Sequence, residues 1–220
     1  MFFKITYLLV AGIASLTLIS GVKAQTFTDI KGNPYEQEIN RATELNIVAG
    51  FPNQTFRPNQ PVKREEAISM IVEALGTLTE IDLKEAPTTR TRPYLDVDEN
   101  RWSYDKITWA QWNIQPEGSA TGNFRPDDYI TRTELVDFLR RAAEFLQVKL
   151  GKSSFLTPTV KEITFSDVSG YELQLTRQMS AYCNVASALN EKGDKFAPKK
   201  SANRDYTAAA IIRMLDCVNK

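Results

Sequence analysis

Three arginines occupy equivalent places in three similar stretches of the chain. Arg64, Arg132 and Arg204 each stand at the expected start of an amphipathic helix, with acidic residues close behind. The first turn of a helix has free backbone N–H groups and a partial positive charge, so an arginine there completes an anion-binding site. The structural alternative is an ion pair with the acid that opens each stretch, such as Asp29 or Asp96. The expected chemistry is therefore anion recognition or an internal salt bridge.

These arginines belong to a sequence pattern that occurs three times. Each copy opens with an aromatic-x-Asp-aliphatic segment, continues to a Phe-x-Pro turn and then reaches the arginine. From the opening Asp to the arginine the separation is 35, 36 and 37 residues. Such a nearly constant spacing indicates one structural unit used three times. The opening segments and their turns are 27–30 with 56–58, 94–97 with 124–126, and 165–168 with 196–198.

Each copy predicts two helices joined by a loop. In the first copy, apolar residues at helical spacing predict helices over about 35–45 and about 62–75, around a Pro- and Asn-rich loop at 51–60. Gly50 is expected to supply the positive-φ position at which a helix often ends. One such unit cannot bury its apolar stripe alone, whereas three units together can. The predicted fold class is therefore all-α.

The repeats set the expected organisation of the chain. The third copy is degenerate, because it lacks the middle Arg and the Glu of the other two. We expect a signal peptide over 1–24, repeats over 25–78, 94–147 and 164–220, and linkers over 79–93 and 148–163.

The first residues have the features of a signal peptide. Lys4 gives a short positive start, 5–20 is apolar, and Val22-Lys23-Ala24 forms a cleavage site before Gln25. An uncleaved anchor is the alternative, although the apolar run is short for a bilayer core of about 30 Å. We expect an exported chain of the cell envelope, in the periplasm or cell wall, with no integral membrane span after cleavage.

Composition excludes several functions. The chain has no histidine, which removes His-based triads, dyads and zinc sites, and two cysteines cannot supply four thiolate ligands. Without its two signal-peptide lysines the chain has 25 basic and 27 acidic residues, so it lacks the charge of a nucleic-acid binder. A glycan hydrolase would need two carboxylates about 5–10 Å apart, but the carboxylates here recur at equivalent repeat positions. We therefore expect no enzyme and no cofactor.

Two cysteines in the third copy predict a disulfide. Cys183 lies towards the end of the first helix of that copy and Cys217 lies at the end of the second. An even pair in an exported chain usually closes. Two buried free thiols are the alternative, and antiparallel helices would place the Cα atoms beyond the bridging limit of about 7 Å.

The three copies resemble the S-layer homology repeat. The resemblance covers roughly residues 27–218 and rests on the Asp-containing opening, a Gly-aromatic-Pro turn, a Phe-Arg-Pro turn and a Thr-Arg-Ala-Glu-like helix start. It implies three helix-loop-helix repeats packed as a pseudo-threefold bundle, with grooves between neighbouring copies. The matching positions are 50–52, 56–58 and 62–66 in the first copy, Asp96, Trp102, 124–126 and 130–134 in the second, and Asp167, Phe196, Pro198 and Arg204 in the third.

The resemblance also implies a function. The family binds a pyruvylated sugar of a cell-wall polymer without catalysis, and it uses the late arginine for this. Arg64 and Arg132 are therefore expected to contact the carboxylate of a wall polysaccharide or a peptidoglycan-linked polymer. Arg204 is expected to matter less, because its copy has lost most of the motif. Alternatively, a degenerate bundle that has lost its pocket would dock a protein partner in the envelope.

Four further residues complete the expected ligand-binding set. Trp102 is expected to stack on a sugar ring, with core packing as the alternative. The backbone at Gly50 is expected to line a groove and let a sugar approach closely. Asp29 and Asp96, which open the first two copies, are assigned to the same surface.

Overall fold

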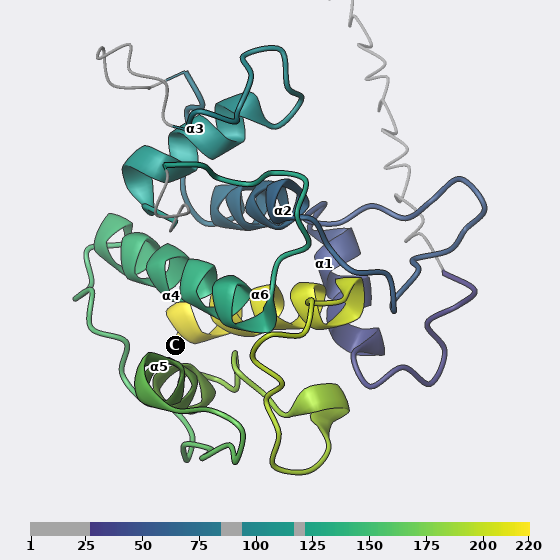
Figure 1. Ribbon diagram of the computed structural model, residues 1–220, viewed down its shortest axis with the longest axis vertical. Coiled ribbons are helices and arrows are strands. Elements are labelled where there is room, and N and C mark those ends of the chain that lie inside the picture. The colour runs from purple at the N-terminus through teal and green to yellow at the C-terminus, as the bar shows by residue number, and fades with distance from the viewer. Residues whose placement is uncertain (1–26, 85–93, 117–121) are drawn as a thin grey trace, which may run out of the picture.

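The computed structural model describes residues 27–84, 94–116 and 122–220, and these residues form helices without strands (Figure 1). The all-α prediction is therefore confirmed. The expected signal peptide and its cleavage site lie outside the described residues. Within the described part of the chain, no helix combines the length and apolar character needed to cross a membrane. The helices are α1 (Glu36–Glu44), α2 (Arg64–Gly76), α3 (Tyr104–Asn113), α4 (Arg132–Lys149), α5 (Gly170–Ala181), the 3₁₀ helix η1 (Leu189–Glu191) and α6 (Arg204–Val218).

The helices pack cyclically. The second helices of the three copies, α2, α4 and α6, contact one another in the centre. Each first helix packs on the second helix of the preceding copy: α3 lies on α2, α5 lies on α4, and α1 closes the cycle on α6 (Figure 1). The three copies thus form the expected pseudo-threefold bundle, in which the last copy contacts the first.

A ring of backbone hydrogen bonds joins the copies where the second helices begin. The N–H of Ile130 donates to the carbonyl of Val62 at 3.0 Å, the N–H of Ala202 donates to Ile130 at 2.8 Å, and the N–H of Val62 donates to Ala202 at 3.0 Å. All three side chains are buried. Paired backbone groups avoid the cost of burying them unbonded, so the ring fixes the mutual position of the three helix starts.

The turn phenylalanine of each copy is fully buried and packs against the aromatic residue that opens the same copy. Because all three pairs have nearly the same geometry, the aromatic positions of the repeat serve the core. The ring centroids lie 5.4 Å apart for Phe27 and Phe56, 5.3 Å for Tyr94 and Phe124, and 5.4 Å for Phe165 and Phe196.

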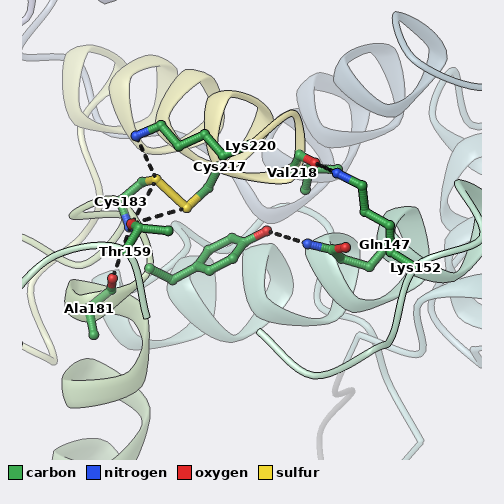
Figure 2. Close-up of a disulfide and its surroundings, with 9 residues drawn as sticks. Gln147, Lys152, Thr159, Ala181, Cys183, Cys217, Val218 and Lys220 are labelled. Carbon is green, nitrogen blue, oxygen red and sulfur yellow. Dashed lines mark hydrogen bonds between the residues drawn. A yellow bond between two sulfur atoms is a disulfide. The ribbon is translucent and has the colours of Figure 1, made fainter. Parts of the chain in front are cut away.

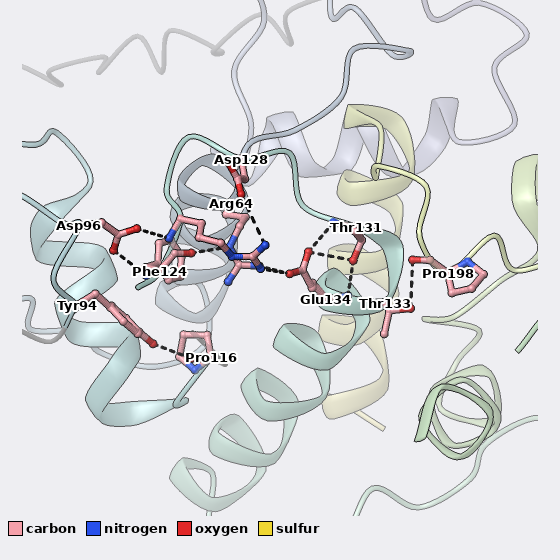
Figure 3. A network of polar contacts seen from close by, with 11 residues as sticks. Arg64, Tyr94, Asp96, Pro116, Phe124, Asp128, Thr131, Thr133, Glu134 and Pro198 are labelled. Atoms are coloured by element: carbon pink, nitrogen blue, oxygen red, sulfur yellow. Dashed lines mark hydrogen bonds and ion pairs between the residues drawn. The ribbon is translucent and has the colours of Figure 1, made fainter. Parts of the chain in front are cut away.

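The opening aspartate of each copy holds the Phe-x-Pro turn. In the second copy, Asp96 accepts hydrogen bonds from the N–H groups of Phe124 and Arg125, both at 2.7 Å (Figure 3). Asp29 and Asp167 bind the equivalent N–H groups of their own copies. The second N–H of each pair belongs to a residue with positive φ, namely Arg57, Arg125 and Ala197. The ion pair between the opening Asp and the late Arg is therefore wrong, because the carboxylate serves the backbone of the turn.

Replacing Asp96 with asparagine should lower the free energy of unfolding by about 1–3 kcal/mol, since the amide turns an N–H group towards one of two backbone donors and leaves it unsatisfied. Urea denaturation followed by circular dichroism measures this change. Asp194→Asn, at an exposed position, is the matched control and should have little effect. Equal stability of the two variants would contradict the proposed role of Asp96.

Candidate functional site

The late arginines join neighbouring copies. The Nε of Arg64 donates to the carbonyl of Phe124 at 2.7 Å, and its Nη1 lies 2.8 Å from the Oε1 of Glu134 (Figure 3). Arg132 and Arg204 repeat the Nε contact, each to the turn phenylalanine of the next copy in the cycle. Each arginine therefore extends from its own helix start into the next copy, and Arg204 completes the cycle at the first one. The other bonds run from Arg132 to Phe196 (2.6 Å) and Ser187 (2.7 Å), and from Arg204 to Phe56 and Ala49 (both 2.9 Å).

Burial separates these arginines from solvent to different degrees. Arg64 is 0% exposed and Arg132 is 2% exposed, whereas Arg204 is half-buried. Each guanidinium also lies over the turn phenylalanine that it bonds, at 4.7–5.0 Å from the ring centroid, a favourable cation–π geometry. Burial lowers the pKa of the Arg64 and Arg204 guanidinium groups from the usual value. In this structure their partners are protein groups, and contact with a ligand carboxylate stays a prediction.

Gly50 has a different structural role from the expected one. It is not among the positive-φ residues, and Asn46, just after α1, takes the left-handed conformation instead. A Cβ on Gly50 would lie 2.0 Å from a ring atom of Phe27. Gly50 is therefore required by the close approach of an aromatic ring, which corrects the expected reason for this glycine. Its contact with a ligand stays a prediction.

Exposed aromatic side chains lie at the boundary between copies 1 and 2. Trp102 is 61% exposed and Tyr129 is 55% exposed. This exposure excludes the core alternative for Trp102, whereas Trp109 on the same copy is buried. Tyr129 forms an isolated antiparallel bridge with Lys63 of the first copy. We call this boundary the copy 1–copy 2 surface and define it by Lys63, Glu65, Arg101, Trp102, Asp127 and Tyr129.

An ionic network connects the two copies at this surface. Arg101 of the second copy donates to Glu65 of α2 through Nε at 2.8 Å and Nη2 at 3.0 Å, and it lies 2.7 Å from Asp127. Lys63 donates to Asp127 at 2.8 Å, and the Ser103 hydroxyl donates to Glu65 at 2.7 Å. Charged groups paired in this way hold one another in fixed positions.

The network keeps Glu65 ionised. Burial by itself raises the pKa of this carboxyl, but hydrogen bonds from Arg101 and Ser103 outweigh burial, and the pKa is lowered overall. The bond to Glu65 in turn raises the pKa of Arg101. Both groups are therefore charged at neutral pH, and the surface combines fixed charges with two exposed aromatic rings.

The other two boundaries differ in chemistry. At the boundary of copies 3 and 1, Asp205 is buried and accepts a hydrogen bond from Asn33 at 3.0 Å, and burial raises its pKa. The cavity beside it, about 10 Å³, is far smaller than a sugar. At the boundary of copies 2 and 3, Thr133 replaces the acid and bonds the carbonyl of Pro198 at 3.2 Å. The copy 1–copy 2 surface is therefore the strongest candidate site among the described residues.

The sequence predicted a role for Trp102 but not for three other residues of the copy 1–copy 2 surface, namely Arg101, Lys63 and Tyr129. Arg101 and its partner Glu65 are 36 residues apart, so their pairing depends on how two copies meet. The available signal was the Arg-Trp pair before α3, because an exposed tryptophan next to an arginine is typical of binding surfaces.

We call the bonds from Arg64, Arg132 and Arg204 to the next copy in the cycle the arginine joints. Together with the cyclic packing, they define a helical protein built from three repeats. Residues 26–68 match the family model of the S-layer homology domain. The match covers the first copy, and the second and third copies repeat its Asp-bound turn and its arginine joint.

The relatives that this chain matches are longer proteins. The chain is 28% identical to an amylopullulanase of Thermoanaerobacterium thermosulfurigenes over 87% of its length, but this covers 10% of the relative. A cell surface protein of Thermoanaerobacter kivui is 30% identical over 54% of the chain and 15% of the relative. A cellulosome-anchoring protein of Acetivibrio thermocellus is 25% identical over 77% of the chain and 35% of the relative. The chain thus spans only a small part of the curated relatives that it matches.

Proposed function

We propose that this protein is a non-catalytic attachment module of the cell envelope, which binds a cell-wall glycopolymer at the copy 1–copy 2 surface. The names of its relatives, which include a cell surface protein and a cellulosome-anchoring protein, support attachment in general. The amylopullulanase and the chain share only a tenth of the enzyme's length, so the resemblance gives no support to catalysis here.

The observation that carries the proposal is that two exposed aromatic residues, Trp102 and Tyr129, belong to the same boundary as the fixed charges. An aromatic face suits the C–H surface of a sugar ring, and the phenol O–H of Tyr129 can bond a sugar hydroxyl. A polymer with an acidic sugar would place its ring on Trp102 and its carboxylate near the cations of the surface.

Lys63 is the cation that we assign to the ligand's carboxylate. Its side chain is 40% exposed, and only one of its three ammonium donors is needed for Asp127. Arg64 follows Lys63 directly but is buried, so in this proposal it holds the turn of the second copy in place behind the surface. A ketal pyruvate is the acidic group that we propose for the polymer.

Replacing Trp102 with alanine should weaken binding to purified cell wall several-fold, because a stacked aromatic pair contributes about 0.5–1.5 kcal/mol. Sedimentation of the protein with wall material measures the affinity. Trp112→Ala is the matched control, since Trp112 is also partly exposed but lies at the other end of α3. Equal affinities of the two variants would contradict the assignment of the surface.

The acidic group is tested on the wall rather than on the protein. Mild acid that removes ketal pyruvate should reduce sedimentation of the wild-type protein, and Lys63→Gln should reduce it on untreated wall only. Unchanged binding after acid treatment would exclude pyruvate as the determinant. Failure to bind protein-free wall altogether would favour an envelope protein as the partner.

A further inference from the structure

A pocket of about 430 Å³ lies at the C-terminal ends of α4 and α6. The copy 1–copy 2 surface lies elsewhere, at the N-terminal end of α2. The volume falls within the range of about 300–1,000 Å³ that is typical of small-molecule sites. The lining residues are Gln147, Lys152, Ser153, Phe155, Thr157, Thr159, Tyr182, Cys217 and Lys220.

The walls of this pocket are held in place by covalent and polar contacts. A disulfide joins Cys183 to Cys217, with the Cα atoms 5.7 Å apart, so the geometric obstacle to this bridge does not arise. The hydroxyl of Thr159 lies 3.1 Å from the sulfur of Cys183, and Gln147 donates to the Tyr182 hydroxyl at 3.2 Å (Figure 2). The segment after α4 is thereby fixed against α5 and α6, and the pocket is preformed.

Two lysines lie in the lining of this pocket. They are Lys152 and Lys220, and none of the described lining residues has an acidic side chain. The ammonium of Lys152 donates to the carbonyl of Val218 at 2.6 Å, and its backbone N–H donates to Gln147 at 2.8 Å (Figure 2). These bonds satisfy one carbonyl near the C-terminal end of α6 and one near the C-terminal end of α4. Helix C-terminal ends carry a partial negative charge, so a lysine is favourable there.

Both lysines keep donors for a ligand. An ammonium group has three N–H donors, and Lys152 uses one of them on Val218. The ammonium of Lys220 makes a weak contact with the sulfur of Cys183 at 3.6 Å. A carboxylate beside the Lys152 ammonium would accept charge-assisted hydrogen bonds, which are about twice as strong as neutral ones.

The remaining lining residues suit a sugar. Phe155 lines the pocket and is 69% exposed, so a ligand can reach its ring. Hydroxyl groups of Ser153 and Thr157 and the amide of Gln147 surround the same space. We propose that this pocket is a second binding site and takes an acidic saccharide, with its carboxylate at Lys152 and one ring face on Phe155.

An NMR titration of the full chain with glucuronic acid as the probe tests this site. Glucuronic acid should shift the amide signals of Lys152, Phe155 and Thr159 in a saturable way. Glucose has the hydroxyls without the charge, and acetate has the charge without the ring, so each should bind at least several-fold more weakly. If acetate binds as well as glucuronic acid, the assignment of a saccharide ligand is wrong. If glucuronic acid gives no saturable shift, the proposed site does not exist.

Variants connect the binding to the named residues. Lys152→Gln should weaken glucuronic acid about tenfold or more, through the loss of a charge-assisted bond. Phe155→Ala should weaken it several-fold without affecting the fold, because the side chain is exposed. Lys195→Gln, an exposed lysine outside the lining, is the matched control. An effect of Lys195→Gln equal to that of Lys152→Gln would indicate nonspecific attraction and contradict the site.

The second site is independent of the proposed wall-binding surface. Trp102→Ala should leave the glucuronic acid titration unchanged, and Phe155→Ala should leave the Trp102-dependent part of wall binding unchanged. The two assignments can therefore fail separately.

Discussion

Replacing Arg64 with alanine is expected to lower the free energy of unfolding by about 3–5 kcal/mol, the range for breaking a buried ion pair from one side. The side chain is completely buried and bonds both Glu134 and the carbonyl of Phe124. Its removal leaves Glu134 with a reduced set of partners, leaves a buried carbonyl unbonded and opens a void between two copies. Stability, rather than wall affinity alone, should therefore report on this residue.

Urea denaturation with two probes measures the effect of Arg64→Ala. Arg57→Ala is the matched control, because Arg57 is exposed and the third copy already has Ala197 at the equivalent left-handed position. The control should change stability by no more than about 0.5 kcal/mol. Arg204→Ala should fall between the two, since Arg204 is only half-buried. A loss below about 1 kcal/mol for Arg64→Ala would contradict the joint.

Reduction of the disulfide is expected to lower the free energy of unfolding by about 3–4 kcal/mol, because the cross-link no longer restricts the unfolded chain. The bonded cysteines are 34 residues apart in sequence. Thermal unfolding with and without a phosphine reductant measures the change. The double variant Cys183→Ser/Cys217→Ser is the control and should not respond to the reductant.

The disulfide prediction has a second readout. Unreduced, denatured protein should contain no reactive thiol from Cys183 or Cys217, whereas two thiols per chain would contradict the bridge. Because Cys217 lines the pocket beside α4 and α6, reduction should also weaken glucuronic acid binding. The serine variant should show the same weakening without reductant.

The repeat pattern predicted the helices well because their signals are local. Apolar residues at helical spacing placed the first two helices at about 35–45 and 62–75, and the structure has them at Glu36–Glu44 and Arg64–Gly76. The pseudo-threefold arrangement came from the family resemblance. The proposed repeat and linker boundaries stay predictions, although α4 extends to Lys149, past the expected start of the second linker at 148.

The partners of the charged residues could not be predicted in the same way. Asp96 binds backbone N–H groups, and Arg64 binds a backbone carbonyl in another copy. Nearly every residue has the same backbone groups, so a backbone partner cannot be recognised from residue types. The pairing of opposite charges was the natural hypothesis, and it failed for the opening aspartates for this reason.

The candidate surface was only partly visible in the sequence. Trp102 was identified from the family resemblance, and its exposure is consistent with the predicted contact with a ligand. Tyr129 reaches the same boundary by pairing with Lys63 of the first copy. The burial of Arg64 and Arg132 likewise depends on the closed packing of all three copies, which no single copy encodes.

The cyclic packing described above makes each of the three copies necessary to the fold. In an open repeat array, a terminal copy contacts one neighbour only, so its loss leaves the contacts among the other copies intact. Here the third copy binds both others, since its Arg204 bonds Phe56 of the first copy and its Phe196 accepts the bond of Arg132. A chain without the third copy would lose both of these bonds, so the closed cycle needs all three copies. Although the third copy departs from the repeat pattern at several positions, it keeps Asp167, Phe196, Pro198 and Arg204, and each of these takes part in its turn or in its bonds to a neighbouring copy.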